Sequence, residues 1–190
     1  VVNAPAAITV ATAEHTVGLM IALARHIAAG DASLKAGRWD RSKLVGVELR
    51  GKTLGVIGLG RIGSQVARVA RAMEMNVIGF DPGIGPEGFA NLGVGVATFD
   101  EVLGQSDFIT LHAILPPGSK HLLDEAQFAM LKPGARIINV ARGSLINEDA
   151  LLAALNSGKV AGAAIDVYNK EPVPADNELV KHPNIVATPH

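Results

Sequence analysis

Short apolar segments that alternate with helical segments are the feature that most restricts how this chain can fold. Each apolar segment is three to five residues long, which is typical of a buried strand. The segments are 53–57, 76–80, 108–111, 136–140, 161–165 and 185–187. Strands that are apolar on both faces and alternate with helices form a parallel sheet covered by helices on both faces. Because the crossovers of such units are right-handed, the sequence predicts an α/β fold with a doubly wound parallel sheet.

Local signals mark several of the helices. Apolar residues recur at helical spacing over Arg61–Met73. Thr98 and Glu101 have the spacing of a capping box, which predicts a helix that begins there. Asn147 is expected to cap a further helix, which ends before Gly158.

Composition restricts the class of protein. With 190 residues, 48% of them hydrophobic and 18% charged, the chain can bury a full core, and we expect one compact domain over residues 1–190. The net charge of −1, without a basic face, argues against a nucleic-acid partner. Because the chain has no cysteine, disulfides, thiolate metal sites and a cysteine nucleophile are excluded.

No segment predicts a membrane partner. No stretch reaches the ~18 consecutive apolar residues of a membrane span, and the start lacks the basic and apolar regions of a signal peptide. We therefore expect a soluble protein, with the cytoplasm as its location. The chain starts at Val1 and stops at His190, directly after a strand, which we interpret as the boundaries of an excised domain.

A glycine-rich turn joins the first strand to the helix that follows it. In Gly58-Leu59-Gly60-Arg61-Ile62-Gly63, the first glycine permits a tight turn, the second lets the backbone approach a pyrophosphate, and the third lets helix and strand pack closely. The N-terminus of the helix offers unpaired N–H groups to the anion. Asp81 follows at the end of the next strand, about twenty residues on, which completes the fingerprint of a dinucleotide-binding Rossmann fold.

Asp81 also bears on the choice of dinucleotide. A carboxylate there accepts hydrogen bonds from the adenosine ribose but repels a 2′-phosphate, and no arginine follows within residues 82–85. The sequence therefore favours NAD over NADP. Two plainer interpretations stay open: the glycines form only a structural turn, and Asp81 only starts a turn before Pro82.

Three further segments follow strands, where an open α/β sheet binds its ligands. They are Asn139–Gly143, Asp166–Pro172 and Thr188–His190. Because the carboxyl ends of parallel strands meet at one edge of the sheet, we expect an arginine, a glutamate and a histidine to share one crevice.

On these residues the chain resembles the NAD-binding domain of the D-isomer-specific 2-hydroxyacid dehydrogenases. The matching segments run the whole length of the chain: 2–5, 13–14, 49–55, 80–82, 131–135, 140–143, 162–167 and 188–190. The resemblance implies an oxidoreductase that transfers a hydride between NAD and a D-2-hydroxy acid. It favours D-3-phosphoglycerate, at the first step of serine biosynthesis, with glyoxylate, hydroxypyruvate or D-lactate as alternatives. An NAD-sensing, corepressor-like binding protein is the alternative of another class.

The resemblance also implies the roles of individual residues. Arg142 is expected to bind the substrate carboxylate and carbonyl, because a guanidinium fork suits a planar pair of oxygens. His190 is expected to be the general acid and base, oriented by Glu171. Asp166 is expected to hold the nicotinamide carboxamide, and Ala141 to make a backbone contact nearby. No metal ligand is implied.

The full set of expected cofactor contacts follows from the same resemblance. The set is Gly58, Gly60, Arg61, Ile62, Gly63, Asp81, Pro82, His112, Ala113, Val140, Ala141, Arg142, Asp166 and His190. The remaining histidines belong to no such constellation, and we expect them to be structural or exposed to solvent. They are His15, His26, His121 and His182.

The chain departs from the family at Ile114, where proline is common, at His121, where glycine is usual, and at Ile8, where asparagine is common. These departures concern the adenine pocket and the hinge. The resemblance further implies a second, substrate-binding domain that is absent from this chain. Without that domain we expect the chain to bind NAD but to turn over little or no substrate.

A long helical region is expected from about Val10 to Ala36, apolar almost all round between Thr16 and Ala24. A helix of this kind is buried on every side. We expect a homodimer that forms through the apolar residues 19–23, because the family dimerises through the corresponding helix. Burial against the domain's own sheet is the competing explanation.

Overall fold

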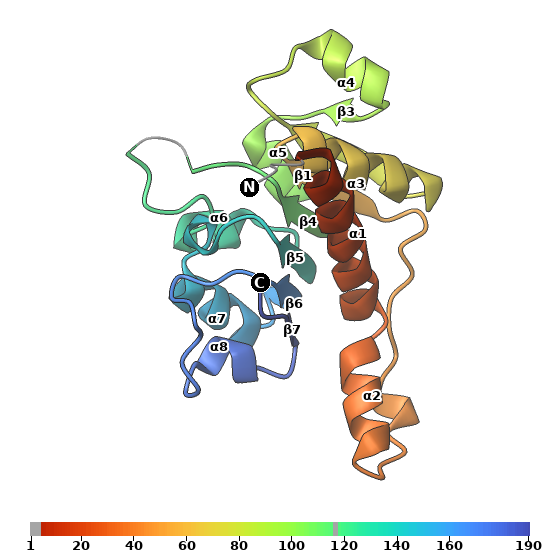
Figure 1. Cartoon of the computed structure of the whole chain (residues 1–190), viewed down its shortest axis with the longest axis vertical. Helices are drawn as coiled ribbons and strands as arrows, with labels where there is room; N and C mark the ends of the chain where they lie inside the picture. The colour runs from red at the N-terminus through yellow and green to blue at the C-terminus, as the bar shows by residue number, and fades with distance from the viewer. Residues whose placement is uncertain (1–4, 116–117) are drawn as a thin grey trace.

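The computed structural model describes residues 5–115 and 118–190; residues 2–4, part of the segments that carry the resemblance, lie outside them. Within the described residues, seven parallel strands form one sheet in the order β3-β2-β1-β4-β5-β6-β7 (Figure 1). The strands are β1 (Thr53–Ile57), β2 (Asn76–Phe80), β3 (Gly95–Val96), β4 (Phe108–Leu111), β5 (Ala135–Asn139), β6 (Val160–Ile165) and β7 (Ile185–Ala187). The predicted doubly wound parallel sheet is confirmed.

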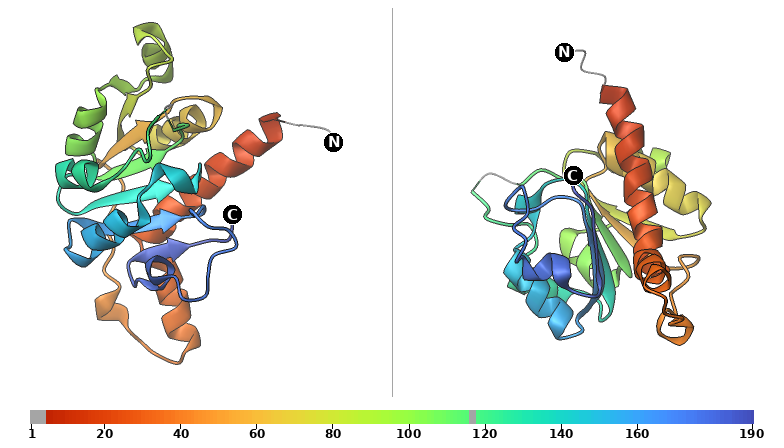
Figure 2. Two further views of the ribbon diagram at one scale, coloured as in Figure 1. Left: turned by 90° about the vertical axis from the view of Figure 1, so that its left-hand side faces the viewer. Right: turned by 60° about the horizontal axis from the view of Figure 1, so that its bottom comes forward.

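Helices cover both faces of the sheet. The helices are α1 (Pro5–Ala24), α2 (Ile27–Lys35), α3 (Arg61–Ala72), α4 (Pro86–Leu92), α5 (Phe99–Gln105), α6 (Glu125–Met130), α7 (Glu148–Asn156) and α8 (Glu178–Lys181). Single 3-10 turns occur at Arg41–Lys43 and Gly143–Leu145. Figures 1 and 2 show α1 and α3 on one face and α5 to α8 on the other.

Each face of the sheet has its own apolar core. On one face, Val56 packs in a cluster with Met20 of α1 and Val66 of α3. On the other face, Ile137 packs in a cluster with Leu151 of α7. Successive residues of a strand point to opposite faces, so strands that are apolar throughout serve both cores at once.

The strand order reverses at the centre of the sheet. Ile57, at the end of β1, is in register with Phe80 of β2 on one side and with Leu111 of β4 on the other. The chain leaves β1 toward β2 and returns to β4 on the opposite side. In open α/β sheets this reversal opens a crevice beyond the carboxyl ends of the strands, which is where the site lies.

The helical region expected over Val10–Ala36 is two helices with an angle of 65° between them. The break lies at His26, whose φ of 54° is left-handed. A residue in that conformation does not continue a right-handed helix. The predicted helical region is therefore present, but it is broken into two helices after Ala24, which the sequence did not indicate.

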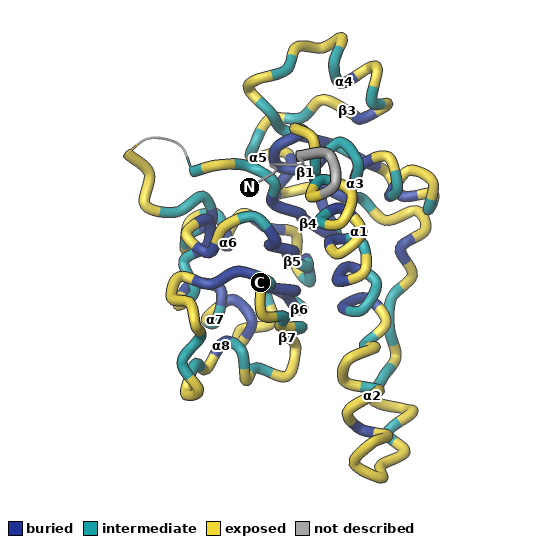
Figure 3. The backbone as a smooth tube through the Cα atoms, in the orientation of Figure 1, coloured by how far each residue is buried: buried dark blue, intermediate teal, exposed yellow. Residues whose placement is uncertain are grey.

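The apolar segment of α1 is buried by this chain itself. Leu19, Met20 and Leu23 are at most 5% exposed and belong to the core on the α1 face of the sheet. Burial in the domain's own core, the competing explanation, therefore holds for these side chains. Four large apolar residues are exposed farther on, in the arm of residues 27–45 that extends from the body of the molecule (Figure 3). Ile8 and Val10, near the start of α1, are exposed as well.

Element boundaries agree closely with the sequence prediction. Thr98 and Glu101 form the capping box at the start of α5, and the Asn147 side chain caps α7, both as predicted. The short strand β3 and helix α4 were not predicted. Among the described residues no single helix is long and apolar enough to span a membrane; α1 and α2 pass that test only when joined across their bend, by length and composition alone.

Candidate active site

The glycine-rich turn leaves β1 at the crevice and leads into α3. Gly58 has a φ of 91°, a conformation that side-chain-bearing residues rarely adopt. A Cβ on Gly63 would lie 2.0 Å from the carbonyl oxygen of Gly58, so the turn closes only without that atom. A Cβ on Gly60, in contrast, would meet nothing within 4 Å. Gly60 therefore faces open space, as expected of a glycine that lets a ligand approach the backbone.

Asp81 ends β2 and holds this turn in place. Its Oδ2 accepts a hydrogen bond of 2.7 Å from the N–H of Leu59, and its Oδ1 accepts one of 2.8 Å from the N–H of Gly83. The bond to Gly83 is the turn that the plainer interpretation of Asp81 expects. The two interpretations are compatible, because each carboxylate oxygen has a second lone pair for a ligand.

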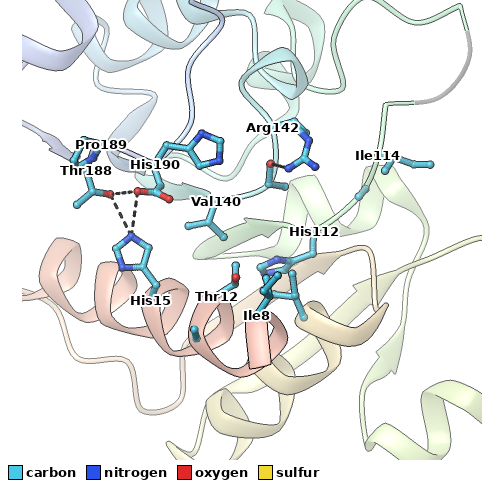
Figure 4. A pocket seen from close by; sticks show the side chains of 15 residues that line it. Ile8, Thr12, His15, His112, Ile114, Val140, Arg142, Thr188, Pro189 and His190 are labelled. Carbon is cyan, nitrogen blue, oxygen red and sulfur yellow. Dashed lines mark hydrogen bonds and ion pairs between the residues drawn. The ribbon is translucent and has the colours of Figure 1, made fainter. Parts of the chain in front are cut away.

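A cleft of about 820 Å³ opens beyond the carboxyl ends of the strands (Figure 4). Helix α1 forms one wall, and Ile62 of α3 and the loops that follow β4, β5, β6 and β7 form the rest. Eight of the predicted cofactor-binding residues line it: Ile62, His112, Ala113, Val140, Ala141, Arg142, Asp166 and His190. The other predicted contacts, Gly58, Gly60, Arg61, Gly63, Asp81 and Pro82, are not among its lining residues.

The two groups of residues meet at His112. A Cβ on Gly58 would lie 2.6 Å from the carbonyl oxygen of His112, and a Cβ on Gly63 would lie 3.3 Å from its side chain. The imidazole Nε2 is 2.9 Å from the hydroxyl of Thr110. Burial lowers the pKa of His112 to about 4, so the ring is neutral at physiological pH. This neutral ring connects the glycine turn to the floor of the cleft.

Arg142 stands on a loop that the end of β5 holds in shape. The Asn139 side chain accepts a hydrogen bond from the N–H of Ala141 and donates one to the carbonyl of Arg142. Gly143 packs so closely against Tyr168 that a Cβ would lie 2.1 Å from the Tyr168 carbonyl. The Arg142 loop is thereby held against the loop that follows β6, while the guanidinium itself is exposed.

Glu171 and His190 form a pair at the mouth of the cleft. Oε2 of Glu171 is 2.7 Å from Nδ1 of His190, and Oε1 accepts a hydrogen bond of 2.9 Å from the N–H of Tyr168. The bond with His190, followed by the bond from Tyr168, lowers the pKa of Glu171. Glu171 is therefore a carboxylate at neutral pH, and it leaves Nε2 as the free nitrogen of the imidazole.

The structure brings the three predicted catalytic residues together. Arg142, Glu171 and His190 line one hollow of about 300 Å³, and Arg142 and His190 also line the larger cleft. They come from three loops that lie side by side, because β5, β6 and β7 are neighbours in the sheet. The three residues are far apart in the sequence, and they lie together because parallel strands end at the same edge of the sheet.

One functional candidate was missed. His15, which we expected to be structural or exposed, lines the cleft, and its Nε2 lies 3.2 Å from Oδ1 of Asp166. The separation of 151 positions and the absence of a local motif gave no sequence signal for this contact. Within the residues that the structure describes, no group of three or more histidine, aspartate or glutamate side chains is arranged to hold a metal ion.

Comparison with known proteins gives one consistent result. Residues 17–190 match the family model described as "D-isomer specific 2-hydroxyacid dehydrogenase, NAD binding domain". The whole chain is 50% identical to a D-3-phosphoglycerate dehydrogenase of Bacillus subtilis and 48% identical to one of Archaeoglobus fulgidus. It covers 36% of each of these relatives, so the chain spans about a third of their length.

A solved structure agrees with the sequence relatives. The crystal structure of a glyoxylate reductase from Paecilomyes thermophila superposes with a TM-score of 0.87 at 39% identity. The match covers 95% of this chain and 54% of that structure. The similarity in fold therefore extends over nearly all of this chain.

Proposed function

Because this chain belongs to the D-isomer-specific 2-hydroxyacid dehydrogenases, as an NAD-binding domain of that family, we propose that the protein transfers a hydride between NAD and a D-2-hydroxy acid. The observation that carries the proposal is the position of Arg142, Glu171 and His190 around one hollow beside the cleft. An arginine binds the carboxylate of a 2-keto or 2-hydroxy acid. An imidazole held by a carboxylate gives a proton to the carbonyl oxygen of the keto acid or takes one from the hydroxyl of the hydroxy acid.

The side chains divide the chemistry between them. Arg142 binds the carboxylate and carbonyl oxygens of the acid, because its five N–H donors form a planar fork. Since Nδ1 of His190 faces Glu171, Nε2 is the nitrogen that gives a proton to the carbonyl oxygen during reduction, or takes it from the hydroxyl during oxidation. Glu171 fixes the orientation of the ring and stabilises its protonated form.

NAD, when bound, supplies or accepts the hydride, and the glycine turn fits its pyrophosphate. The N–H groups of Gly58 and Leu59 are already bonded to Phe80 and Asp81. The N–H groups of Gly60 to Gly63 open α3 and have no partner within the helix, whereas that of Ser64 bonds to the carbonyl of Gly60. Gly60 leaves space in front of them, so the expected contacts of Arg61, Ile62 and Gly63 with the pyrophosphate are compatible with the geometry.

D-3-phosphoglycerate is the proposed substrate, and the supporting observation is the name of the relatives that are about half identical to the chain. The reaction would be its oxidation to 3-phosphohydroxypyruvate, the first step of serine biosynthesis. Reduction of glyoxylate or hydroxypyruvate is the second candidate, supported by the glyoxylate reductase of nearly the same fold.

We further propose that residues 1–190 are one domain of a two-domain dehydrogenase. The short span relative to the curated relatives supports this proposal. The cleft is open to solvent in this chain, and closure by a second domain would exclude water from the site. The chain alone is then expected to bind NAD without measurable turnover.

A homodimer in the cytoplasm completes the proposal. The arm of residues 27–45 supports the dimer, because it exposes Ile27, Leu34, Trp39 and Val45, each at least half exposed to solvent. Apolar side chains of this size, gathered on one segment, are typical of a contact between subunits. The arm replaces residues 19–23 as the proposed contact.

A steady-state assay of the full-length protein tests the function. D-3-phosphoglycerate, glycerate and D-lactate are each offered with NAD, and glyoxylate and hydroxypyruvate with NADH. The proposal expects the highest kcat/KM with D-3-phosphoglycerate and the loss of activity in Arg142→Ala and His190→Ala. Negligible turnover of every acid, with intact NAD binding, would contradict the dehydrogenase proposal and favour an NAD sensor.

A further inference from the structure

Three side chains from distant parts of the chain meet on the α1 side of the cleft. His15 comes from the middle of α1 and Thr188 follows β7 (Figure 4). Asp166 directly follows β6. Nε2 of His15 lies 3.2 Å from Oδ1 of Asp166 and 3.3 Å from Oγ1 of Thr188. The Thr188 hydroxyl donates to the same Oδ1 at 2.5 Å.

The positions of the hydrogens follow from the chemistry of the three groups. A carboxylate only accepts, and a hydroxyl has a single hydrogen to donate. Because the Thr188 hydrogen is given to Asp166, its oxygen only accepts from His15. Nε2 of His15 must therefore carry a hydrogen, which is shared between Asp166 and Thr188. The same bond excludes Thr188 as a nucleophile activated by His15, because its hydrogen points to the carboxylate and not to the ring.

The group is anchored by the sheet. The N–H of Thr188 donates to the carbonyl of Ile165 at 3.0 Å, in the ladder that continues β6 and β7. The hydroxyl of Tyr168 lies 3.0 Å from the carbonyl of Thr188 and 3.0 Å from that of Ile165. The backbone of Thr188 is therefore fixed by the sheet, and the N–H of Asp166 donates to the carbonyl of Asn139 at 3.0 Å. The Asp166 side chain gains a further contact from α1, through His15.

We propose, on the premise of the proposed function, that His15 is a positioning residue of the coenzyme site. Both side-chain contacts of Asp166 fall on Oδ1. Oδ2 is the oxygen without a hydrogen bond from any of the described residues, and Asp166 lines the cleft. His15 and Thr188 thus fix the carboxylate through one oxygen and leave the other for the carboxamide of the nicotinamide.

This arrangement predicts which kinetic constants depend on His15. Loss of the donor leaves the Asp166 side chain held by Thr188 alone. Its carboxylate is then fixed less well, so the nicotinamide is less often in the geometry for transfer. The KM for NAD should rise and kcat should fall, together lowering kcat/KM for NAD by roughly tenfold, the usual effect of a hydrogen bond to a charged group. The KM for the hydroxy acid should stay the same, because Arg142 binds the acid.

The test uses the full-length protein with two substitutions at one position. His15→Leu removes the donor, whereas His15→Gln places an amide N–H close to the position of Nε2. Leucine and glutamine are both good helix formers, so neither substitution should destabilise α1. We expect the loss in His15→Leu and recovery to within about threefold of the wild type in His15→Gln. Glu14→Leu, an exposed position on the same helix, is the matched control.

The outcomes separate this inference from the proposed function. If His15→Leu keeps the KM for NAD and the kcat of the wild type while Asp166→Ala loses NAD binding, the role of His15 is refuted and the dehydrogenase stands. Equal losses in His15→Leu and His15→Gln would also refute it, since the hydrogen bond would then not be the cause. If the wild-type protein does not bind NAD, the proposed function fails and the inference fails with it.

Discussion

His112 shows how one buried side chain makes this domain sensitive to acid. Burial lowers the pKa of His112 to about 4, whereas its ordinary value is 6.5. Between these values the unfolded chain binds a proton at this position and the folded chain does not. The free energy of unfolding therefore falls as the pH drops from 6.5 to 4, by ~3 kcal/mol when the window has been crossed.

The prediction is tested with His112→Gln, which keeps a nitrogen near the hydroxyl of Thr110. Urea unfolding is measured at pH 7 and at pH 4.5 for both proteins. Asp107 and Glu171 also have lowered pKa values and destabilise both proteins in acid, so only the difference between the proteins is informative. The wild type should lose more stability than the variant; equal losses would mean that His112 is protonated in the folded state.

Asp81 and His15 show that a single residue can have both a structural and a functional contact. Asp81 holds the N–H of Leu59 while it remains able to accept from a ribose. His15 belongs to no motif with a predicted role, although it directly follows the matching residues 13–14. It nevertheless contacts the aspartate to which the resemblance assigns the carboxamide. Residue roles that depend on a partner elsewhere in the chain require the structure.

The strand-turn-helix element from β1 to α3 separates two uses of glycine. Gly63 has no room for a Cβ, which would lie 2.0 Å from the carbonyl oxygen of Gly58. Gly60 has room in this chain, but the space is where we propose that the pyrophosphate binds. The two glycines should therefore respond differently to the same substitution.

Gly63→Ala should lower the free energy of unfolding by about 1–3 kcal/mol, the usual cost of overpacking. Gly60→Ala should leave stability within about 0.5 kcal/mol of the wild type. It should nevertheless weaken NAD binding by at least about tenfold. Urea unfolding and titration calorimetry with NAD make the comparison. Wild-type affinity in Gly60→Ala would show that the pyrophosphate does not approach this turn.

The arm of residues 27–45 exposes apolar side chains that the core of this chain does not bury. Trp39 is 81% exposed and Val45 is 77% exposed, whereas the apolar residues of α1 that face the sheet are buried. The arm begins at the 65° break between α1 and α2, which directs it away from the sheet (Figures 1 and 2). A second copy of the chain is the proposed occupant.

We expect the protein to sediment as a dimer at micromolar concentration. Leu34→Glu with Trp39→Glu should convert it to a monomer, because two buried charges without partners are not tolerated in an apolar interface. Ile114→Glu, an exposed apolar position outside the arm, should leave the dimer intact. A wild-type monomer, or a double variant that remains dimeric, would contradict the use of the arm.

The alternation of six strands with helices, the parallel sheet, the glycine turn and three strand-end loops could all be predicted from the sequence, whereas β3 and α4 could not. Apolar segments such as 53–57 and helix caps such as Thr98 and Asn147 depend only on residues close in the sequence, so they can be recognised from the sequence. The residues expected to be catalytic were recognisable because each lies in the loop that follows a strand, and a parallel sheet brings the ends of its strands together.

The burial of individual side chains and the contacts between distant segments could be known only from the structure. It separated buried Leu19 and Leu23 from the exposed arm, because a helix that is apolar all round does not show which neighbour covers it. It brought His15 to Asp166 across 151 positions, since the packing of α1 against the ends of β6 and β7 has no local signature. Burial and contacts between distant residues arise only when the chain packs, so the sequence motifs predicted some residues of the cleft and the structure added the others.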